Sequence, residues 1–332
     1  MSSQETESSA TTSSSSPDTN HDPSKNGATS TVKAKPSQYI ASACPGPDTH
    51  LPPEVGLALA ALRDALKLPL WMIVQSGDNG ANYPDLDEEV WEAFFDTRHE
   101  LPSKQPIALL IHSPGGQAES AYKIASVIRR RCGGFVAVVP RYAKSAATLL
   151  ALGGALIVMG TDAELGPLDA QIFDPEQERW SSALDEVQAL ERVNAFALQA
   201  INEFVLFTQL RSGKKVNTLM PSAMKFVEGM MQPLLNKIDT IHYSQSSRVL
   251  KVAEEYAVRL LMPKYSRREA EKIARHLVEK YPQHEFVIDV EETEKIGLRV
   301  SVADDQVASA IDALIPHLDK INVIGELREV TA

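Results

Sequence analysis

Three short stretches of the sequence combine small residues with a polar side chain that could do chemistry, and each follows a run of apolar, strand-like residues. They are HSPGG at 112–116, AKSAATLLAL at 143–152 and ELGPLDAQ at 164–171. In the second stretch, Ser145 stands where a strand is expected to pass into a helix. A serine in that place is either the N-cap of the helix or a nucleophile, and this stretch alone leaves both interpretations open.

A nucleophilic serine needs a nearby base and hydrogen-bond donors for the oxyanion of its intermediate. The glycines Gly115 and Gly116 follow a strand, and the unpaired N–H groups of such a turn can bind an anion. The N–H of Ala146 together with that of Gly115 or Gly116 would then form an oxyanion hole. Taken alone, the PGG sequence is equally typical of an ordinary turn.

The third stretch places Asp169 directly after the rigid turn formed by Gly166 and Pro167. A turn-forming aspartate is the simplest interpretation of this residue. The carboxyl ends of parallel strands, however, meet at one edge of a sheet. Three successive loops of small and polar residues at such an edge therefore predict a shared cleft rather than three unrelated turns.

The elements that must position these loops follow an α/β pattern over residues 50–332, in which short apolar runs alternate with amphipathic segments. We expect parallel strands at 70–77, 106–113, 133–140 and 155–160, and helices at 51–68, 86–101, 117–131 and 145–152. Residues 183–262 form a predicted helical insertion, in three segments that break near 211–215 and 240–244. The expected return to the sheet comprises a helix at 266–280 that Ser266 can cap, a strand at 284–289, and helices at 290–297 and 304–318.

Composition limits the remaining possibilities. Residues 1–40 are rich in Ser and Thr and nearly free of aliphatic and aromatic side chains, which predicts a disordered tail. The tail lacks a signal-peptide pattern, and the longest apolar run, 146–159, is shorter than a membrane-spanning helix, so we expect a cytoplasmic protein. The net charge of −11 argues against general nucleic-acid binding. Cys44 and Cys132 offer no disulfide framework or zinc spacing, and neither a metal nor a cofactor is expected.

The blocks LLIHSPGG, VVPRYAKSAATLLALGGALIVMG and ELGPLDAQ closely resemble, in order and spacing, the serine dehydrogenase proteinase family. This family is a branch of the Clp protease and crotonase superfamily and is related to the signal-peptide peptidases. The resemblance is dense over residues 105–172 and looser at HEFVIDVEETEKIGLRV. It implies a Clp protease/crotonase-like spiral of parallel strands and helices, and a homo-oligomeric serine peptidase acting on peptides or proteins. Its relatives often carry an N-terminal membrane segment, so membrane association stays open although no transmembrane segment is predicted here.

The resemblance makes Ser145 the nucleophile and places Gly115, Gly116 and Ala146 at the oxyanion hole, in agreement with the interpretation from the residues themselves. In two respects this chain departs from the relatives. They commonly have Pro where this chain has Ala170, and Met rather than Lys before the serine. Both differences concern the shape of the cleft more than its chemistry.

The resemblance points less directly to the general base that would activate Ser145. The family is thought to run serine, aspartate, histidine along the chain, and this order fits Asp169 and His284 after the serine. A histidine oriented by an aspartate suits the task, because imidazole can take and return a proton at neutral pH. Lys144 is assigned to a solvated edge or to electrostatic support. The other histidines considered are expected to be structural or on the surface: His112, His242 and His276.

Three functions are therefore compared. The leading hypothesis is a serine-type endopeptidase that works through an acyl-enzyme. A crotonase-like acyl-CoA enzyme would share the fold and the oxyanion hole, but it would leave the small residues around Ser145 unexplained. A non-catalytic oligomeric scaffold of the same fold is the third, since the identity of the base is open.

Overall fold

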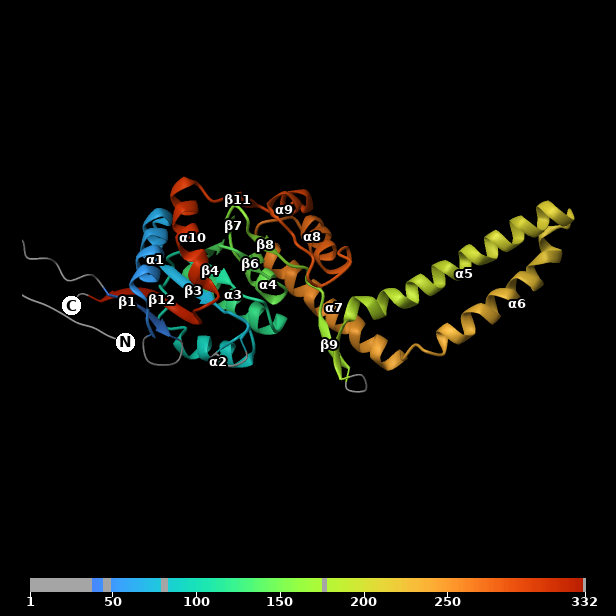
Figure 1. Cartoon of the computed structure of the whole chain (residues 1–332), viewed down its shortest axis with the longest axis horizontal. Coiled ribbons are helices and arrows are strands. Elements are labelled where there is room, and N and C mark those ends of the chain that lie inside the picture. The colour runs from blue at the N-terminus through green and yellow to red at the C-terminus, as the bar shows by residue number, and fades with distance from the viewer. Residues whose placement is uncertain (1–37, 44–48, 79–82, 175–177, 331–332) are drawn as a thin grey trace, which may run out of the picture. The chain divides into compact units, whose positions relative to one another are not determined.

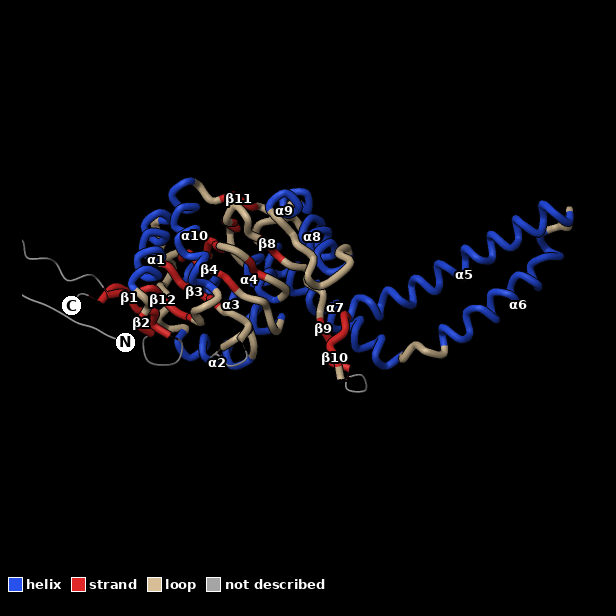
Figure 2. Tube along the Cα trace, in the orientation of Figure 1, coloured by secondary structure: helices blue, strands red, loops and turns tan. Residues whose placement is uncertain are grey.

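The computed structural model describes residues 38–43, 49–78, 83–174 and 178–330. Within these residues the main sheet has eight strands (Figure 2). Their order is β11 (Val300–Val302), β7 (Leu156–Met159), β5 (Phe135–Val139), β4 (Ile107–His112), β3 (Leu70–Val74), β12 (Val323–Val330), β1 (Gln38–Ala43) and β2 (Thr49–His50). The strands from β11 to β3 are parallel, whereas β12, β1 and β2 pair with their neighbours in antiparallel fashion.

Side-chain alternation along the central strands divides the core into two layers. Leu70 and Met72 of β3 pack with one face of the sheet, where α1 (Pro53–Leu66) and α10 (Asp305–Leu318) lie side by side (Figure 1). Trp71 and Ile73 point to the other face. That face is covered by α2 (Glu88–Thr97), α3 (Ala118–Cys132), α4 (Ala146–Leu152), α7 (Thr240–Leu261) and α8 (Arg267–Glu279). Both faces are covered, as is usual for parallel strands of nearly continuous apolar composition.

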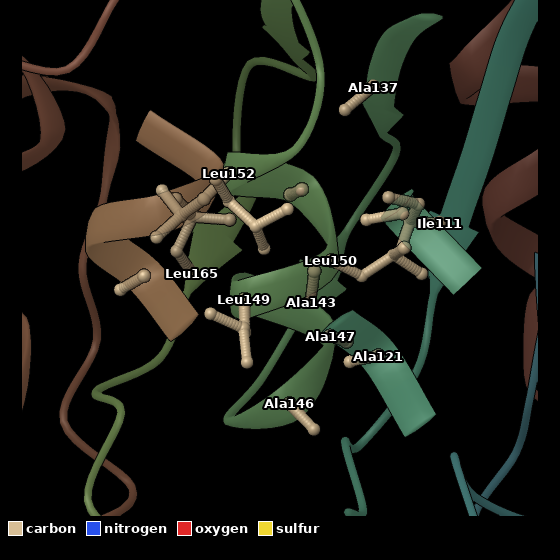
Figure 3. Packing of buried hydrophobic residues seen from close by; sticks show 14 of the residues in the cluster. Ile111, Ala121, Ala137, Ala143, Ala146, Ala147, Leu149, Leu150, Leu152 and Leu165 are labelled. Carbon is tan, nitrogen blue, oxygen red and sulfur yellow. The ribbon is translucent and has the colours of Figure 1, made fainter. Parts of the chain in front are cut away.

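The short helix α4 is buried along its whole length. A helix that is apolar on every side belongs in a protein interior rather than on its surface. Figure 3 shows Leu150 directed toward Ile111 of β4 and Ala147 beside Ala121 of α3. The helix that begins immediately after Ser145 is thus fixed by packing on all sides.

The segment after β7 leads through a hairpin of β9 (Gln171–Asp174) and β10 (Arg179–Ser182) into α5 (Ala183–Ser212) and α6 (Val216–Leu235). The side chain of Ser182 accepts a hydrogen bond from Asp185 and caps α5, and Gly213 ends it in the left-handed conformation. Helices α5 and α6 run antiparallel and in contact (Figure 1). The sequence thus predicts the three helices of this region well, and the second break falls at 236–239, just before the expected position.

The α/β class is confirmed, and so is the capping of α8 by Ser266, which forms a reciprocal capping box with Glu269. The short helix α9 (Val290–Ile296) also lies where it is expected. The sheet is not wholly parallel, however, because the polar residues within β12 hide its strand pattern. Of the expected tail, residues 1–37 lie outside the described residues, while 38–40 belong to β1 and bury Ile40.

The expected strand at 284–289 is wrong. Within the described residues, only Ile288 makes a bridge there, to Leu165. The partner strand, β8 (Glu164–Leu165), is only two residues long, so the segment has little backbone to pair with. Phe286 and Ile288 pack against the core without forming a strand.

His112 ends β4 and points to the same face as Leu110 before it, toward α10. It is fully buried, its Nε2 lies 3.3 Å from Oδ1 of Asp319, and its ring packs on Tyr142. Burial lowers the pKa of His112 from 6.5 to about 4, against the opposing effect of the hydrogen bond to Asp319. The residue is therefore a neutral structural histidine, as its position under the PGG turn predicts.

This buried histidine makes a prediction about acid stability. The unfolded chain takes up a proton on His112 near pH 6.5, whereas the folded chain does so only near pH 4. Acidification through this interval therefore lowers the free energy of unfolding, by up to about 3 kcal/mol from this residue. We expect His112→Gln to lose less stability over the interval than the native protein, in urea unfolding followed by circular dichroism.

The matched control is His276→Gln, because the His276 side chain on α8 keeps 36% of its area exposed to solvent. This variant is expected to follow the native pH dependence. Equal losses in the native protein and in His112→Gln would contradict the assignment of a buried neutral imidazole.

Candidate active site

Short backbone pairings beyond the strand ends hold the three predicted loops in one layer. The N–H of Ser113 donates to the carbonyl of Tyr142 at 3.3 Å, and the N–H of Lys144 donates to the carbonyl of Ser113 at 3.0 Å. The two-residue strand β6 (Tyr142–Ala143) then pairs in parallel with β8. The loops around 113, 143 and 165 therefore meet at the carboxyl edge of the parallel strands, as the sequence predicts.

The same layer reaches the segment that carries His284. Leu165 and Ile288 exchange two backbone hydrogen bonds, of 2.9 and 3.1 Å. This pairing joins the loop after β7 to a segment more than a hundred residues later in the chain. It brings residues 284–288 to the edge of the sheet where Ser145 lies.

Ser145 has a strained backbone. Its φ is 48° and its ψ is −118°, a conformation that favours glycine and is rare for other residues. Such strain costs on the order of 1–3 kcal/mol and tends to occur at functional sites. The residue stands at the N-cap position of α4, yet its side chain makes no capping hydrogen bond. Of the two interpretations that the sequence leaves open, the capping role is therefore not supported.

Two glycines from different loops pack closely against Ser145. A Cβ atom on Gly115 would lie 2.9 Å from the Cβ of Ser145, and one on Gly166 would lie 3.2 Å from the Ser145 nitrogen. The first distance is shorter than real Cβ contacts, and the second is tighter than most of them. The absence of side chains at these two positions lets the three backbones meet around the serine.

Among the backbone N–H groups of this layer that have no hydrogen-bond partner in the described residues are those of Gly116 and Ala146. The N–H of Gly115, by contrast, donates to Oγ of Ser113 at 3.1 Å. Gly116 has a φ of 135°, and a Cβ there would lie 2.6 Å from the backbone of Leu86, so no other residue fits without a shift of the chain. Of the three groups expected at an oxyanion hole, two are available and one is engaged.

A buried glutamine, which the sequence analysis did not single out, fixes the glycine loop. Oγ of Ser113 donates to Oε1 of Gln75 at 2.7 Å, and Nε2 of Gln75 donates to the carbonyls of Tyr83 and Asp85. Gln75 is fully buried at the end of the apolar run of β3. Gln75 is a polar residue at the carboxyl end of a central strand, in the same place along β3 as HSPGG along β4. This position was the signal that could have identified it.

Thr148 ties α4 to the third loop. Its Oγ1 accepts a hydrogen bond from the N–H of Gly166 at 2.9 Å and donates to the carbonyl of Ala143 at 2.6 Å. The side chain is fully buried, so both bonds lie in a low-dielectric interior. This hydroxyl holds the glycine of the third loop against the serine, and it is the one polar side chain of an otherwise apolar helix.

Asp169 lies below the surface, with 3% of its area exposed, and accepts a hydrogen bond from the N–H of Leu184 at 3.3 Å. Burial raises the pKa of its carboxyl above the usual value, while hydrogen bonds from Ser182 and Leu184 and the charge of His284 act in the opposite direction. The structure contains no hydrogen bond between Asp169 and His284 among the described residues.

His284 is half-buried, and its Nδ1 is buried without a hydrogen-bond partner in the described part of the chain. Neither His284 nor Asp169 hydrogen-bonds to Ser145 there. Lys144 forms an ion pair with Glu164, with Nζ and Oε1 2.8 Å apart, so its ammonium is held by the third loop. The structure thus brings the serine together with its backbone donors, but among the described residues no hydrogen bond links Ser145, Asp169 and His284 to one another.

The described residues contain no group of three or more His, Cys, Asp or Glu side chains that could hold a metal ion. Cys132 is buried, and burial raises the pKa of its thiol to about 11, while Cys44 lies outside the described residues. None of the described helices combines the length and the apolar character needed to cross a membrane.

The strain at Ser145 makes a prediction about stability. Glycine adopts a φ of 48° at little cost, whereas alanine does not. We expect Ser145→Gly to be more stable than Ser145→Ala by about 1 kcal/mol, because both variants lack the hydroxyl and differ only in the Cβ. The free energies of unfolding are measured by urea denaturation.

The matched pair is Ser301→Gly and Ser301→Ala, at an exposed strand position without positive φ. There glycine is expected to be the less stable of the two. If Ser145→Gly were less stable than Ser145→Ala, as is expected of the two Ser301 variants, the backbone strain at Ser145 would be refuted.

The part of the chain that carries the candidate site is similar to a known protein family. Residues 85–194 match the profile of a family described as ClpP-like SDH-type serine proteinase. The matched segment contains Ser145, Asp169 and the glycine loops. His284 lies outside it, so the match does not extend to the expected base.

Two curated relatives, the uncharacterized proteins MJ1495 and MJ0137 of Methanocaldococcus jannaschii, are each 26% identical to this chain, over 200 and 199 residues. The aligned part is 60% of this chain in both cases, and 53% and 54% of the relatives. The chain thus spans about half the length of the curated relatives it matches.

Among solved structures, the chain is similar to a mutant of the membrane-bound stomatin-specific protease 1510-N, with a TM-score of 0.37 and 14% identity, covering 67% of this chain and 76% of the other. It is also similar to ClpP1 from Listeria monocytogenes, with a TM-score of 0.35 and 11% identity, covering 72% and 94%. The family match over residues 85–194 confirms the resemblance that the motifs indicate, and it identifies the part of the chain around Ser145 as similar to the ClpP-like SDH-type serine proteinases.

Proposed function

We propose that the chain is a serine-type endopeptidase that hydrolyses peptide bonds through an acyl-enzyme on Ser145. The observation that carries the proposal is the strained φ of 48° at Ser145, in a turn between strand and helix. Serine nucleophiles of other hydrolases stand on strained turns of this kind, which expose the hydroxyl. The family match over residues 85–194 supports a serine peptidase at the level of the family.

In the proposed reaction, Oγ of Ser145 attacks the carbonyl carbon of the peptide bond while His284 takes the hydroxyl proton. The N–H groups of Gly116 and Ala146, which have no partner among the described residues, donate to the resulting oxyanion. His284 then returns the proton to the leaving amine as the C–N bond breaks, which leaves the acyl-enzyme. Water attacks the ester by the same route and frees the serine.

In this proposal Asp169 orients His284 and stabilises its charged form. Burial raises the pKa of the Asp169 carboxyl, and the charge of His284 is among the weaker effects that oppose this rise. Gly115 has a different role from its neighbour, because its own N–H is engaged by Ser113. It allows the close approach of the glycine loop to the serine. Lys144 supports the third loop through Glu164.

A non-catalytic scaffold of the same fold is the second candidate. The observation in its favour is that no basic side chain hydrogen-bonds to Ser145 among the described residues. Catalytic hydrogen bonds often tighten only when substrate binds, so the peptidase remains the better-supported proposal. The two functions differ in whether Ser145 reacts as a nucleophile.

A fluorophosphonate probe separates them. The serine oxygen forms a bond to phosphorus and fluoride leaves, so only an activated serine is labelled. We expect labelling of the native protein at Ser145, none in Ser145→Ala, and a rate at least about a hundredfold lower in His284→Ala, because the base is lost. Labelled residues are mapped by peptide mass spectrometry.

The control is His276→Ala, which removes a partly exposed histidine on α8 and is expected to label at the native rate. Folded native protein that fails to label would support the scaffold. If Ser145→Ala were labelled to the same extent as the native protein, another residue would be the nucleophile. If His284→Ala were labelled at the native rate, another residue would be the base.

We also propose that copies of the chain associate through α5 and α6. Apolar side chains along both helices are exposed to between 36% and 87%, the largest value being that of Leu210. They are Phe196, Leu198, Leu206, Phe207 and Leu210 on α5, and Val216, Met224, Phe226, Met230, Leu234 and Leu235 on α6. Exposed apolar area on this scale is typical of protein–protein interfaces.

Sedimentation velocity tests the association. We expect an oligomer for the full chain and a shift toward monomer in the double variant Phe207→Glu with Leu210→Glu, since charges are excluded from the centre of an interface. Leu57→Glu, at an exposed position on α1, is the matched control and is expected to keep the native state. A monomeric native protein would contradict the proposal.

A further inference from the structure

A second site lies at the opposite edge of the sheet from Ser145. A cavity of about 570 Å³ opens between the carboxyl ends of α3, α4 and α7. Gly134 and Ala155, which line it, directly precede β5 and β7, whereas the serine loops follow the far ends of the parallel strands. The cavity is therefore separate from the proposed active site.

The lining of this cavity is strongly basic. It includes Arg129, Arg130, Arg259 and Lys264, and no aspartate or glutamate is among the described residues that line it. This concentration of positive charge stands out in a chain whose net charge is −11. Of the four, only Arg259 forms an ion pair with a carboxylate in the described part of the chain, that of Glu255 at 3.0 Å.

The negative carboxyl ends of three helices offset part of this positive charge. Nζ of Lys264 donates to the carbonyl of Leu152 at 2.8 Å and also to that of Gly154, and so it satisfies the carboxyl end of α4. Each helix C-terminus carries about half a negative charge, so the ends of α3, α4 and α7 offset roughly one and a half of the four positive charges. Together with Glu255, they leave more than one positive charge without a counter-charge.

Two of these side chains, Lys264 and Arg129, lie in surroundings that disfavour their positive charge. Lys264 and Arg129 are partly buried, and burial, with the charges of Arg129 and Arg299, lowers the pKa of Lys264 to about 8. Burial also lowers the pKa of Arg129. Within the described part of the chain, Arg129 donates only to the carbonyl of Leu260, at 3.4 Å, which leaves most of its guanidinium donors without a partner there. A bound anion would relieve the repulsion between these groups.

We propose that this cavity binds a small phosphorylated molecule with at least two negative charges. Guanidinium groups bind phosphate oxygens in a bidentate manner, and three arginines from two helices converge here. The cavity has the size usual for small-molecule sites. Tyr122, stacked on Tyr256 at a centroid distance of 4.3 Å, adds an apolar surface for the organic part of such a ligand.

Pyrophosphate is the probe, titrated into the full-length protein by calorimetry at neutral pH. We expect saturable binding that weakens with salt, and a further loss of about tenfold in affinity for each of Arg130→Gln and Arg259→Gln. Both side chains are exposed, so the variants are expected to fold, which circular dichroism checks. Lys264 is not varied, because it holds the end of α4.

Arg268→Gln, an exposed arginine on α8 outside the cavity, is the matched control and is expected to bind as the native protein does. Citrate and a poly-glutamate peptide at the same concentration are expected to bind more weakly than pyrophosphate. Absent binding, binding that both cavity variants leave unchanged, or equal or tighter binding of citrate or the peptide would each overturn the proposal.

Discussion

The contact of two glycine backbones with Ser145 is the constraint on which the rest of the structure depends. Neither Gly115 nor Gly166 could carry a Cβ without meeting the serine or its neighbour, and the serine itself is held at a φ of 48°. A strained residue keeps its conformation only when its surroundings are rigid. Buried polar side chains supply that rigidity, with Gln75 fixing the first glycine loop through Ser113 and Thr148 fixing the third.

The alternation of side chains along β4 separates two kinds of polar chemistry. His112 points toward α10 and stays neutral beside Asp319, while the backbone of Ser113 turns into the layer that holds Ser145. Because consecutive residues of a strand face opposite sides, a buried histidine and the candidate active site lie one residue apart without sharing an environment. Proximity in the sequence is therefore a poor guide to which histidine serves the serine.

Helix α4 connects the two sites. Its first N–H, that of Ala146, directly follows the serine and has no partner among the described residues, whereas the carbonyl of Leu152 at its other end is held by Lys264 at the basic cavity. These are the positive and negative ends of one helix dipole. A short helix that is buried on every side thus presents donors at one edge of the sheet and requires cations at the other.

The sequence by itself determined which loops meet, because strands of continuous apolar composition pair in parallel and their carboxyl ends share an edge. It also located α5, α6 and α7 and the cap at Ser266, since helix periodicity and capping are local. Only the tertiary structure decided the conformation of Ser145, the engagement of the Gly115 N–H, the roles of Gln75 and Thr148, and the antiparallel pairing of β12. These depend on contacts between segments far apart in the chain. The approach of residues 284–288 through the Leu165–Ile288 bridge depends on them in the same way, and no local pattern encodes it.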